Sequence, residues 1–217
     1  MNVVRAVVLR AFPFKDYDRI LTLFSPFGLI KLFVKSKKRE WLHYAALTSP
    51  LTEAEFHYTQ GKKELHRFTE GAILKQNIRI RDRYENLLAA EKMVQALLNS
   101  QWPGRTAPKL YQLFSLFLEI LPDSADPLTL STIFLLKTMR HEGLLQLSAD
   151  LSACSRYAGE RYSTKEAPFG SLTLSSEEEA LFTELALCRS LGQISACSVP
   201  KEFIEKMECL FSQTFSQ

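Results

Sequence analysis

The chain has 217 residues, 46% of them hydrophobic and 24% charged, a composition that excludes a disordered chain and is ordinary for a soluble globular protein. No apolar run reaches the ~20 residues that cross a bilayer, and Arg5 and Arg10 interrupt the apolar N-terminal stretch, so we expect a cytoplasmic protein with no membrane contact. The net charge of +3 is unevenly divided, because residues 1–81 hold 15 Lys and Arg against 7 Asp and Glu, whereas residues 82–217 hold 12 against 17. This asymmetry favours a polyanionic partner for the first part, and chance variation of a solvated surface is the alternative.

The first 80 residues have the pattern of short strands separated by turns. Runs rich in β-branched and aromatic residues alternate with turn-forming sequences such as Ser25–Gly28 and Gln60–Lys63. About five short strands without a long helical pattern are typical of a small closed barrel or sandwich. The predicted strands are Val3–Arg10, Arg19–Phe24, Leu29–Lys35, Leu51–Tyr58, Leu65–Glu70 and Ala72–Ile80.

The period of the apolar residues changes to that of helices from Arg83 onward. We therefore expect a helical domain over 82–217 behind a β domain over 1–80, an α+β organisation. About five helices are predicted, within Tyr84–Ser100, Lys109–Leu121, Pro127–Gly143, Ser175–Gly192 and Pro200–Phe211.

The strand Leu29–Lys35 carries the clearest indication of function. Side chains alternate between the two faces of a strand, so Lys31, Phe33 and Lys35 should face outward while the aliphatic residues between them face the core. An exposed aromatic ring between lysines suits single-stranded nucleic acid, because the cations follow the phosphates and the ring stacks on a base. Alternatively, Phe33 covers a sheet edge or meets the helical domain.

Further basic residues extend this outer face into the neighbouring loops. Phe12, Phe14 and Tyr17 add aromatic rings beside the same loops, whereas Glu53, Glu55 and His57 should form an acidic face on another strand. The predicted nucleic-acid contacts are Arg10, Lys15, Arg19, Lys31, Phe33, Lys35, Lys37, Lys38, Arg39, Lys62, Lys63 and Arg67.

Motifs for catalysis are missing from the sequence. There is no G-x-S-x-G, P-loop, G-x-G-x-x-G or H-E-x-x-H, and the four histidines are scattered. Asp16 and Asp18 lie beside Lys15 and Arg19, which favours a solvated charge cluster or an ion pair over an acid–base pair. We therefore predict a protein that is not an enzyme.

The segment Ala6–Arg39 resembles the N-terminal barrel of the bacterial RecO family of recombination mediators. In that family a Val-Leu-Arg strand is followed by a Pro-aromatic step, a D-R-[IL]-L-T-L-[FY] segment, a turn with Gly and a strand that ends in a basic cluster. The stretches "PLTEAEFHY", "LHRFTEGAIL" and "LLKTMRHEGLLQLSADLSAC" are also similar, so the resemblance covers nearly the whole chain. The matching residues in the first segment are Val8–Arg10, Pro13–Phe14, Asp18–Phe24, Ser25–Gly28 and Lys35–Arg39.

The resemblance implies an OB-fold (oligonucleotide/oligosaccharide-binding) barrel and a non-enzymatic DNA-repair factor. Similar proteins bind single- and double-stranded DNA, anneal complementary strands and help load RecA onto DNA coated by single-strand-binding protein (SSB), together with RecR. They also contact the acidic C-terminal tail of SSB, for which a cationic and apolar site is needed. Candidate residues for that site here are Lys109, Lys137, Arg140 and His141.

Two departures from the family pattern concern a turn and a metal site. Ser36 stands where family members usually have Gly, so this turn must find another conformation. Many members also have a zinc site begun by C-x-x-C-G. Here Cys154 is kept but Tyr157 replaces the second Cys, so we expect the zinc site near 150–170 to be lost and no cofactor to be bound.

Alternatives remain open at this stage. The barrel could dock a protein partner in an adaptor without DNA affinity, or bind RNA as a translation factor. The oligomeric state, the residues that meet RecR and SSB, and the role of Trp41 are not given by the sequence.

Overall fold

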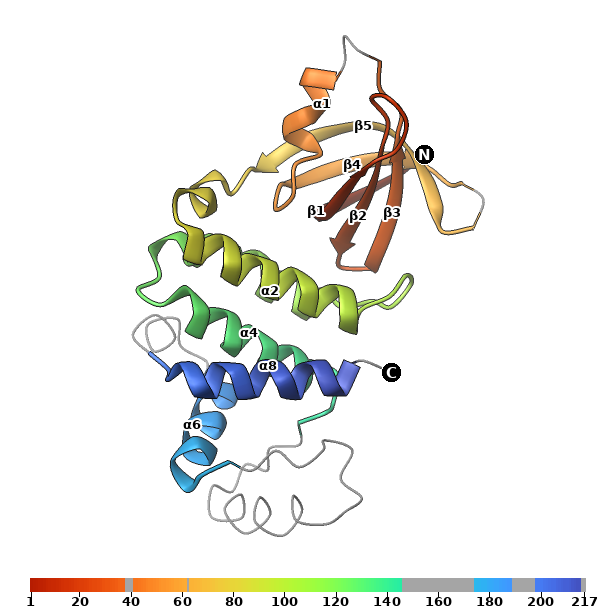
Figure 1. The fold of residues 1–217 in the computed structure, drawn as a ribbon. Helices are drawn as coiled ribbons and strands as arrows, with labels where there is room; N and C mark the ends of the chain where they lie inside the picture. Colours follow the sequence, from red (N-terminus) through yellow and green to blue (C-terminus); the bar gives the residue numbers. More distant parts are fainter. Residues whose placement is uncertain (38–40, 62, 146–173, 189–197, 216–217) are drawn as a thin grey trace. The chain divides into compact units, whose positions relative to one another are not determined.

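The computed structural model describes residues 1–37, 41–61, 63–145, 174–188 and 198–215 (Figure 1). The chain forms two compact units. The first contains Met1–Arg83 and Gln101–Pro122, and the second contains Tyr84–Ser100 and Asp123–Gln217. The segment Gln101–Pro122 thus packs with the β domain, whereas sequence order alone groups it with the helices.

The first unit is built on a closed five-stranded barrel in the order β1-β2-β3-β5-β4 (Figure 1). Strands β3 and β5 pair in parallel and all other neighbours are antiparallel. The predicted fold class, a five-stranded OB-like barrel followed by helices, is confirmed. The strands are β1 Asn2–Pro13, β2 Arg19–Ser25, β3 Gly28–Val34, β4 Glu53–Thr59 and β5 Leu65–Lys75.

Strand β1 closes the barrel because it pairs with both β2 and β4. Its first half pairs with β4 and its second half with β2, and the register shifts between Val8 and Arg10. Such an irregularity bends a strand and increases its twist. The barrel interior is filled by alternating apolar side chains, as the period-2 pattern predicts. Its core contains Val4, Ala6, Val8, Leu21, Leu23, Ile30, Leu32, Val34, Leu47, Ala54, Phe56 and Phe68.

Two helices complete the first unit. Helix α1, Trp41–Leu47, was not expected from the sequence; its Tyr44 ring meets Phe68 edge-on, with centroids 5.5 Å apart, and its Leu47 enters the barrel core. Helix α3, Pro108–Ile120, packs Tyr111 and Phe114 on Phe24, with ring centroids 6.0 and 6.3 Å away. Both helices therefore cover apolar surface that the barrel would otherwise expose.

The sixth predicted strand, Ala72–Ile80, is wrong in its second half. Strand β5 runs unbroken through Gly71 to Lys75, and Ile78–Asp82 then forms a 3₁₀ helix. Asn77 ends the extended run because it adopts a left-handed conformation, φ 50°, and its side chain donates to the carbonyl oxygen of Leu51 at 2.8 Å. Asn is one of the few residues that adopts this conformation readily.

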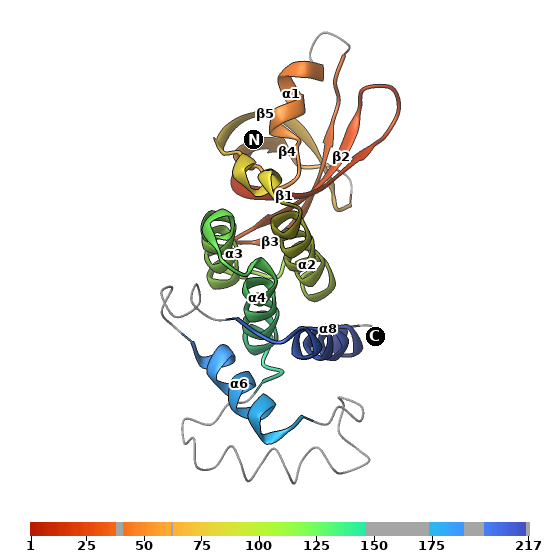
Figure 2. The same ribbon diagram turned by 60° about the vertical axis from the view of Figure 1, so that its left-hand side comes forward.

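The second unit consists of helices around α4, Pro127–His141 (Figure 2). This helix is buried along most of its length, as its apolar sequence predicts, and it contacts α2, α6 and α8. Asp126 caps its N-terminus by accepting a hydrogen bond from the Thr129 amide at 3.1 Å. The surrounding helices are α2 Tyr84–Ser100, α6 Ser176–Leu187 and α8 Lys201–Phe215.

Helix α6 begins with a capping box at Ser175, where the predicted helix also starts. The Ser175 hydroxyl accepts from the Glu178 amide at 3.2 Å, and the Glu178 carboxylate accepts from the Ser175 amide at 2.8 Å. Lys206 of α8 donates to the same Glu178 carboxylate at 2.6 Å and so joins α8 to α6. Within the part of the chain that the structure describes, none of the helices is long and apolar enough to span a bilayer.

Candidate nucleic-acid interface

The outer face of β3 has the predicted alternation. Lys31 and Lys35 are exposed, Phe33 is half-buried, and Leu32 and Val34 are buried in the barrel. Phe14, one residue past the end of β1, meets the Phe33 ring edge-on with centroids 5.7 Å apart. The strand therefore presents two cations on either side of an aromatic pair.

Strand β5 adds a third cation beside Phe33. The parallel pairing of β3 with β5 places Arg67 opposite Phe33. A shallow groove of about 350 Å³ runs between them and is lined by Phe33, Lys35, Leu65, His66 and Arg67. The groove therefore offers an aromatic ring for stacking and positive charge for phosphate, the two features that surfaces for single-stranded nucleic acid combine.

Sequence reasoning missed two residues of this groove, Leu65 and His66. His66 stacks on Tyr58, with centroids 5.2 Å apart, and its Nδ1 accepts the amide hydrogen of Gly61 at 3.3 Å. In a neutral ring this acceptor role puts the proton on Nε2. The only sequence signal was that Leu65, an apolar residue, opens a strand next to the basic turn Gln60–Lys63.

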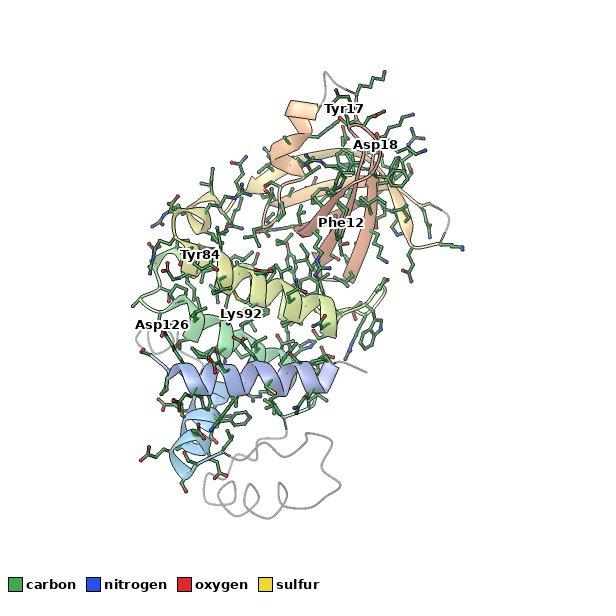
Figure 3. All side chains as sticks on the ribbon, viewed as in Figure 1. Phe12, Tyr17, Asp18, Tyr84, Lys92 and Asp126 are labelled. Carbon is green, nitrogen blue, oxygen red and sulfur yellow. The ribbon has the colours of Figure 1, made fainter. Side chains whose placement is uncertain are left out.

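The turn between β1 and β2 lies next to the end of β3 (Figure 3). Lys15 and Asp16 both have positive φ, 40° and 34°, which makes the turn tight. Lys15 is exposed with its Nζ 5.8 Å from the Phe14 ring centroid. Asp18 accepts a hydrogen bond from the backbone amide of Ser36 at 2.9 Å, so it has a specific partner within the chain.

Arg19 and Arg10, which the sequence suggested as phosphate contacts, are less exposed than the predicted lysines of the described residues. Arg19 is half-buried and its guanidinium donates to the Thr48 hydroxyl at 2.6 Å, just past the end of α1. Burial lowers the pKa of Arg19 from its ordinary value. Arg10 is also half-buried, on β1 directly after the register shift. Arg19 therefore helps to hold α1 on the barrel.

The other predicted contacts lie at the rim of the groove or outside the described residues. Lys37 and Lys63 are exposed, and Lys63 adopts φ 59° in the β4–β5 turn. Lys31 forms a loose ion pair with Glu64, 3.7 Å apart. Lys38, Arg39 and Lys62 are outside the residues that the structure describes, and so is the side chain of Trp41.

The prediction of an acidic outer face on β4 is wrong for Glu53. Glu53 is 1% exposed, and its carboxylate accepts from Arg5 Nε at 2.7 Å and from the Tyr111 hydroxyl at 2.8 Å. Burial by itself would raise the pKa of Glu53, but the bonds from Arg5 and Tyr111 and the charge of Arg5 bring it below the ordinary value. Helix α3 covers this part of β4, which alternation alone did not show.

Glu55 and His57 remain on the surface of β4, as predicted. His57 lies 3.0 Å from Glu55 and 3.6 Å from Glu70 of β5. These two carboxylates make this part of β4 unattractive to phosphate, in contrast to the basic residues of β3 and the start of β5.

The candidates for an acidic peptide in the helices are largely engaged within the chain. Lys137 donates to the carbonyl oxygen of Cys188 and Arg140 to that of Ala186, at 3.3 Å for Arg140. Both therefore serve the C-terminal end of α6, where helix carbonyls lack partners. His141 pairs with Glu142 at 3.0 Å, and Lys109 is exposed on α3 in the first unit. Lys137, Arg140 and His141 of α4 thus each have a partner within the second unit.

No group of three metal-ligating side chains converges among the described residues. Cys188 and Cys209, which lie among the described residues, are not joined in a disulfide. Cys154 and Tyr157 lie outside the described residues, so the expected loss of the zinc site stays a prediction.

A closed five-stranded barrel with this strand order and a basic, aromatic outer face defines an OB-like protein with an attached helical unit. Comparison with known proteins identifies the family. Residues 1–77 match the family described as recombination protein O N terminal. A DNA repair protein RecO of Chlamydia pneumoniae is 31% identical over 96% of this chain and 86% of its own. The chain therefore belongs to the RecO family of DNA repair proteins.

Other relatives extend the similarity to both units. DNA repair protein RecO of Chlamydia trachomatis serovar L2 is 28% identical over 97% of this chain and 91% of its own. The Chlamydia muridarum protein of the same name is 25% identical over 99% of this chain and 96% of its own. The match includes the helical unit as well as the barrel, in agreement with the resemblance seen in the sequence.

Proposed function

We propose that this chain is a DNA recombination mediator that binds single- and double-stranded DNA, anneals complementary strands, and with RecR helps to load RecA onto SSB-coated DNA. The observation that carries the proposal is the outward set of Lys31 and Phe33 on β3 and Lys35 directly after it, with Arg67 alongside from β5. Membership of the RecO family supports the same role.

The cations would supply most of the affinity. Each phosphate neutralised by Lys or Arg releases condensed counterions, which lowers the log of the binding constant by about 0.7 per decade of salt on single strands and about 0.9 on duplex. The exposed residues Lys15, Lys31, Lys35, Lys37 and Arg67 are suited to this task. Phe33, with Phe14 behind it, would stack on unpaired bases.

Annealing by such a surface needs no bond to be made or broken. Two strands held by their phosphates on cationic surfaces repel each other less, and their bases stay free to pair. The partners RecR and the SSB tail follow from the family, and RecA would be affected through them. We place this activity in the bacterial cytosol, at the nucleoid. The chain would catalyse no reaction in this role.

The experiment that tests the proposal is strand annealing of SSB-coated DNA, combined with DNA-binding titrations at several salt concentrations. Lys37→Ala with Lys38→Ala should weaken binding to all sequences alike. The salt slope on single strands should fall by about 0.7 for each phosphate that is no longer neutralised. A matched control is Lys75→Ala with Lys201→Ala, which removes the same charge at exposed positions outside the basic face.

The outcomes separate this function from its rivals. Unchanged affinity and an unchanged salt slope in the Lys37/Lys38 variant would show that those lysines do not contact DNA. Binding to a protein partner, with none to DNA at about 50 mM salt, would favour an adaptor, because electrostatic contacts to DNA are strong at low salt. Tighter binding to single-stranded RNA than to DNA in competition would favour a role in RNA metabolism.

We also propose that the chain holds no structural zinc. Zinc in such sites needs four convergent Cys or His ligands, and Tyr157 occupies the position of the second cysteine after Cys154. Metal analysis of the purified protein should find less than stoichiometric zinc, and one zinc per chain would contradict this part of the proposal.

A further inference from the structure

The backbone of Asp18 is fixed within the β1–β2 turn. Its amide donates to the carbonyl oxygen of Lys15 at 2.7 Å, and its own carbonyl oxygen accepts from the Phe14 amide at 2.8 Å. Positive φ at Lys15 and Asp16 closes the turn between these bonds. Asp18 therefore stands at a defined position on the barrel, directly before Arg19 and the β2 ladder.

The side chain of Asp18 crosses to the segment that follows β3. Strand β3 ends at Val34, which pairs with Arg19, and the regular ladder stops there. Beyond it, Asp18 Oδ1 accepts the backbone amide hydrogen of Ser36 at 2.9 Å. A hydrogen bond to an ionised acceptor is roughly twice as strong as one between neutral groups. This bond holds the segment at the point where it leaves the sheet.

The residues on either side of Ser36 are the exposed lysines Lys35 and Lys37. Their positions depend on the backbone at Ser36, because each is one residue away from it. We propose that Asp18 is a positioning residue for DNA binding: its carboxylate orients Lys35–Lys37 toward the phosphates without touching DNA. This inference rests on the proposed function. The charge of Asp18 is opposite to that of the lysines that it positions.

The sign of the effect distinguishes this role from simple electrostatics. An acidic residue in a basic DNA-binding face repels phosphate, so its removal should tighten binding if charge alone mattered. Positioning has the reverse consequence for Asp18→Ala, which removes the acceptor together with the charge. Asp18→Asn removes the charge but keeps a carbonyl oxygen that can accept from Ser36.

The test uses the full chain with single-stranded DNA at several salt concentrations. Asp18→Ala should bind more weakly than wild type, and its salt slope should fall by about 0.7 for each phosphate that the lysines no longer neutralise. Asp18→Asn should bind as tightly as wild type or more tightly. The control Asp16→Asn removes one charge at an exposed position two residues away and should also keep or increase affinity.

A second background shows whether Asp18 acts through the lysines. In a protein that already carries Lys35→Ala and Lys37→Ala, Asp18→Ala should cause no further loss of affinity, because the groups it orients are gone. A loss of the same size in both backgrounds would mean that Asp18 acts elsewhere. Tighter binding by Asp18→Ala, matching Asp16→Asn, would overturn the inference outright.

Hydrogen exchange of the Ser36 amide gives a measurement that does not depend on whether a variant folds. In wild type this amide should exchange more slowly than the same amide in an unfolded chain, because it is bonded to Asp18. An unprotected Ser36 amide in wild type would overturn the inference. If wild type failed to bind DNA while Ser36 was protected, the proposed function would fail and the geometry around Asp18 would stand.

Discussion

The hydroxyl of Tyr111 on α3 donates to the carboxylate of Glu53 on β4 at 2.8 Å, in the interior of the first unit. Arg5 of β1 donates to the same carboxylate oxygen at 2.7 Å. A buried carboxylate is stable only when its hydrogen-bonding capacity and its charge are met. Tyr111 and Arg5 meet them from two different elements, and so this contact fastens α3 to the barrel.

Replacing Tyr111 by Phe should lower the free energy of unfolding by about 1–3 kcal/mol, the usual cost of leaving a buried polar group without one partner. The ring and its packing on Phe24 are kept, so the change reports the hydroxyl alone. Urea unfolding followed by circular dichroism measures it.

Tyr84→Phe is the matched control, because Tyr84 is 73% exposed and its hydroxyl can bond to water. That variant should stay within about 0.5 kcal/mol of wild type, as surface substitutions do. Equal stability of the two variants would mean that the Tyr111 hydroxyl contributes nothing to the attachment of α3.

Glu53 should also make the fold sensitive to acid. Its folded pKa lies below the ordinary value of 4.5 because the bonds from Arg5 and Tyr111 outweigh the effect of burial. A carboxyl group with a depressed folded pKa contributes stability above its unfolded pKa, and this contribution is lost as pH falls through the folded value. The free energy of unfolding should therefore decline below about pH 4.5, as measured by urea titrations across that range.

Glu178 complicates the acid dependence and provides its control. Its pKa is also lowered, by the hydrogen bond from Lys206 and then by that from the Ser175 amide. Glu178→Gln should remove part of the decline and leave the rest, whereas Glu53→Gln should remove the part due to Glu53 at a cost in stability at neutral pH. An acid decline of full size in Glu53→Gln would show that Glu53 does not titrate as expected.

The sequence predicts local features of this fold well because they depend on neighbours along the chain. The alternation of Lys31, Phe33 and Lys35 follows from strand geometry, and the helix predicted from Ser175 follows from the period of its apolar residues. The prediction for Glu53 is wrong because the same alternation places its side chain outward. Helix α3, more than fifty residues later in the chain, packs over that outer face and buries it.

Non-local pairing also explains why the groove was only half predicted. Phe33 and Arg67 belong to strands that pair in parallel over a short stretch, and the sequence of neither strand predicts which strand it pairs with. Leu65 and His66 enter the site through that pairing. For Asp18 the sequence favours a charge cluster, because a bond from a side chain to the backbone of Ser36 leaves no trace in residue type.

Gly28 and Gly104 form a natural pair for testing close backbone packing. Both have positive φ, 93° and 79°, so an L-residue is strained at either position. A Cβ at Gly28 would lie 2.5 Å from the carbonyl oxygen of Arg105 and 2.8 Å from that of Trp102, whereas nothing lies within 4 Å at Gly104. Gly104→Ala should cost about 1–2 kcal/mol, and Gly28→Ala should cost clearly more.

The two glycine variants are compared by urea unfolding under one set of conditions. Because the atoms that crowd Gly28 are backbone atoms, they cannot move aside as a flexible side chain would. A Gly28→Ala variant no less stable than Gly104→Ala would mean that the segment after Gln101 does not pack on the β2–β3 turn as described.

Phe33→Leu tests whether the aromatic ring of β3 recognises unpaired bases. Leu keeps much of the apolar contact with Phe14 but has no flat face, and stacking is worth about 1–3 kcal/mol per base. Affinity for single-stranded DNA should therefore fall about 5- to 150-fold, with an unchanged salt slope and little change for duplex, as measured by fluorescence anisotropy. The matched control is Phe27→Leu, which changes an exposed ring in the β2–β3 turn and should leave both affinities as they are. An equal loss for duplex and single strands would assign Phe33 to the packing of the barrel surface, since a base-stacking ring discriminates between the two.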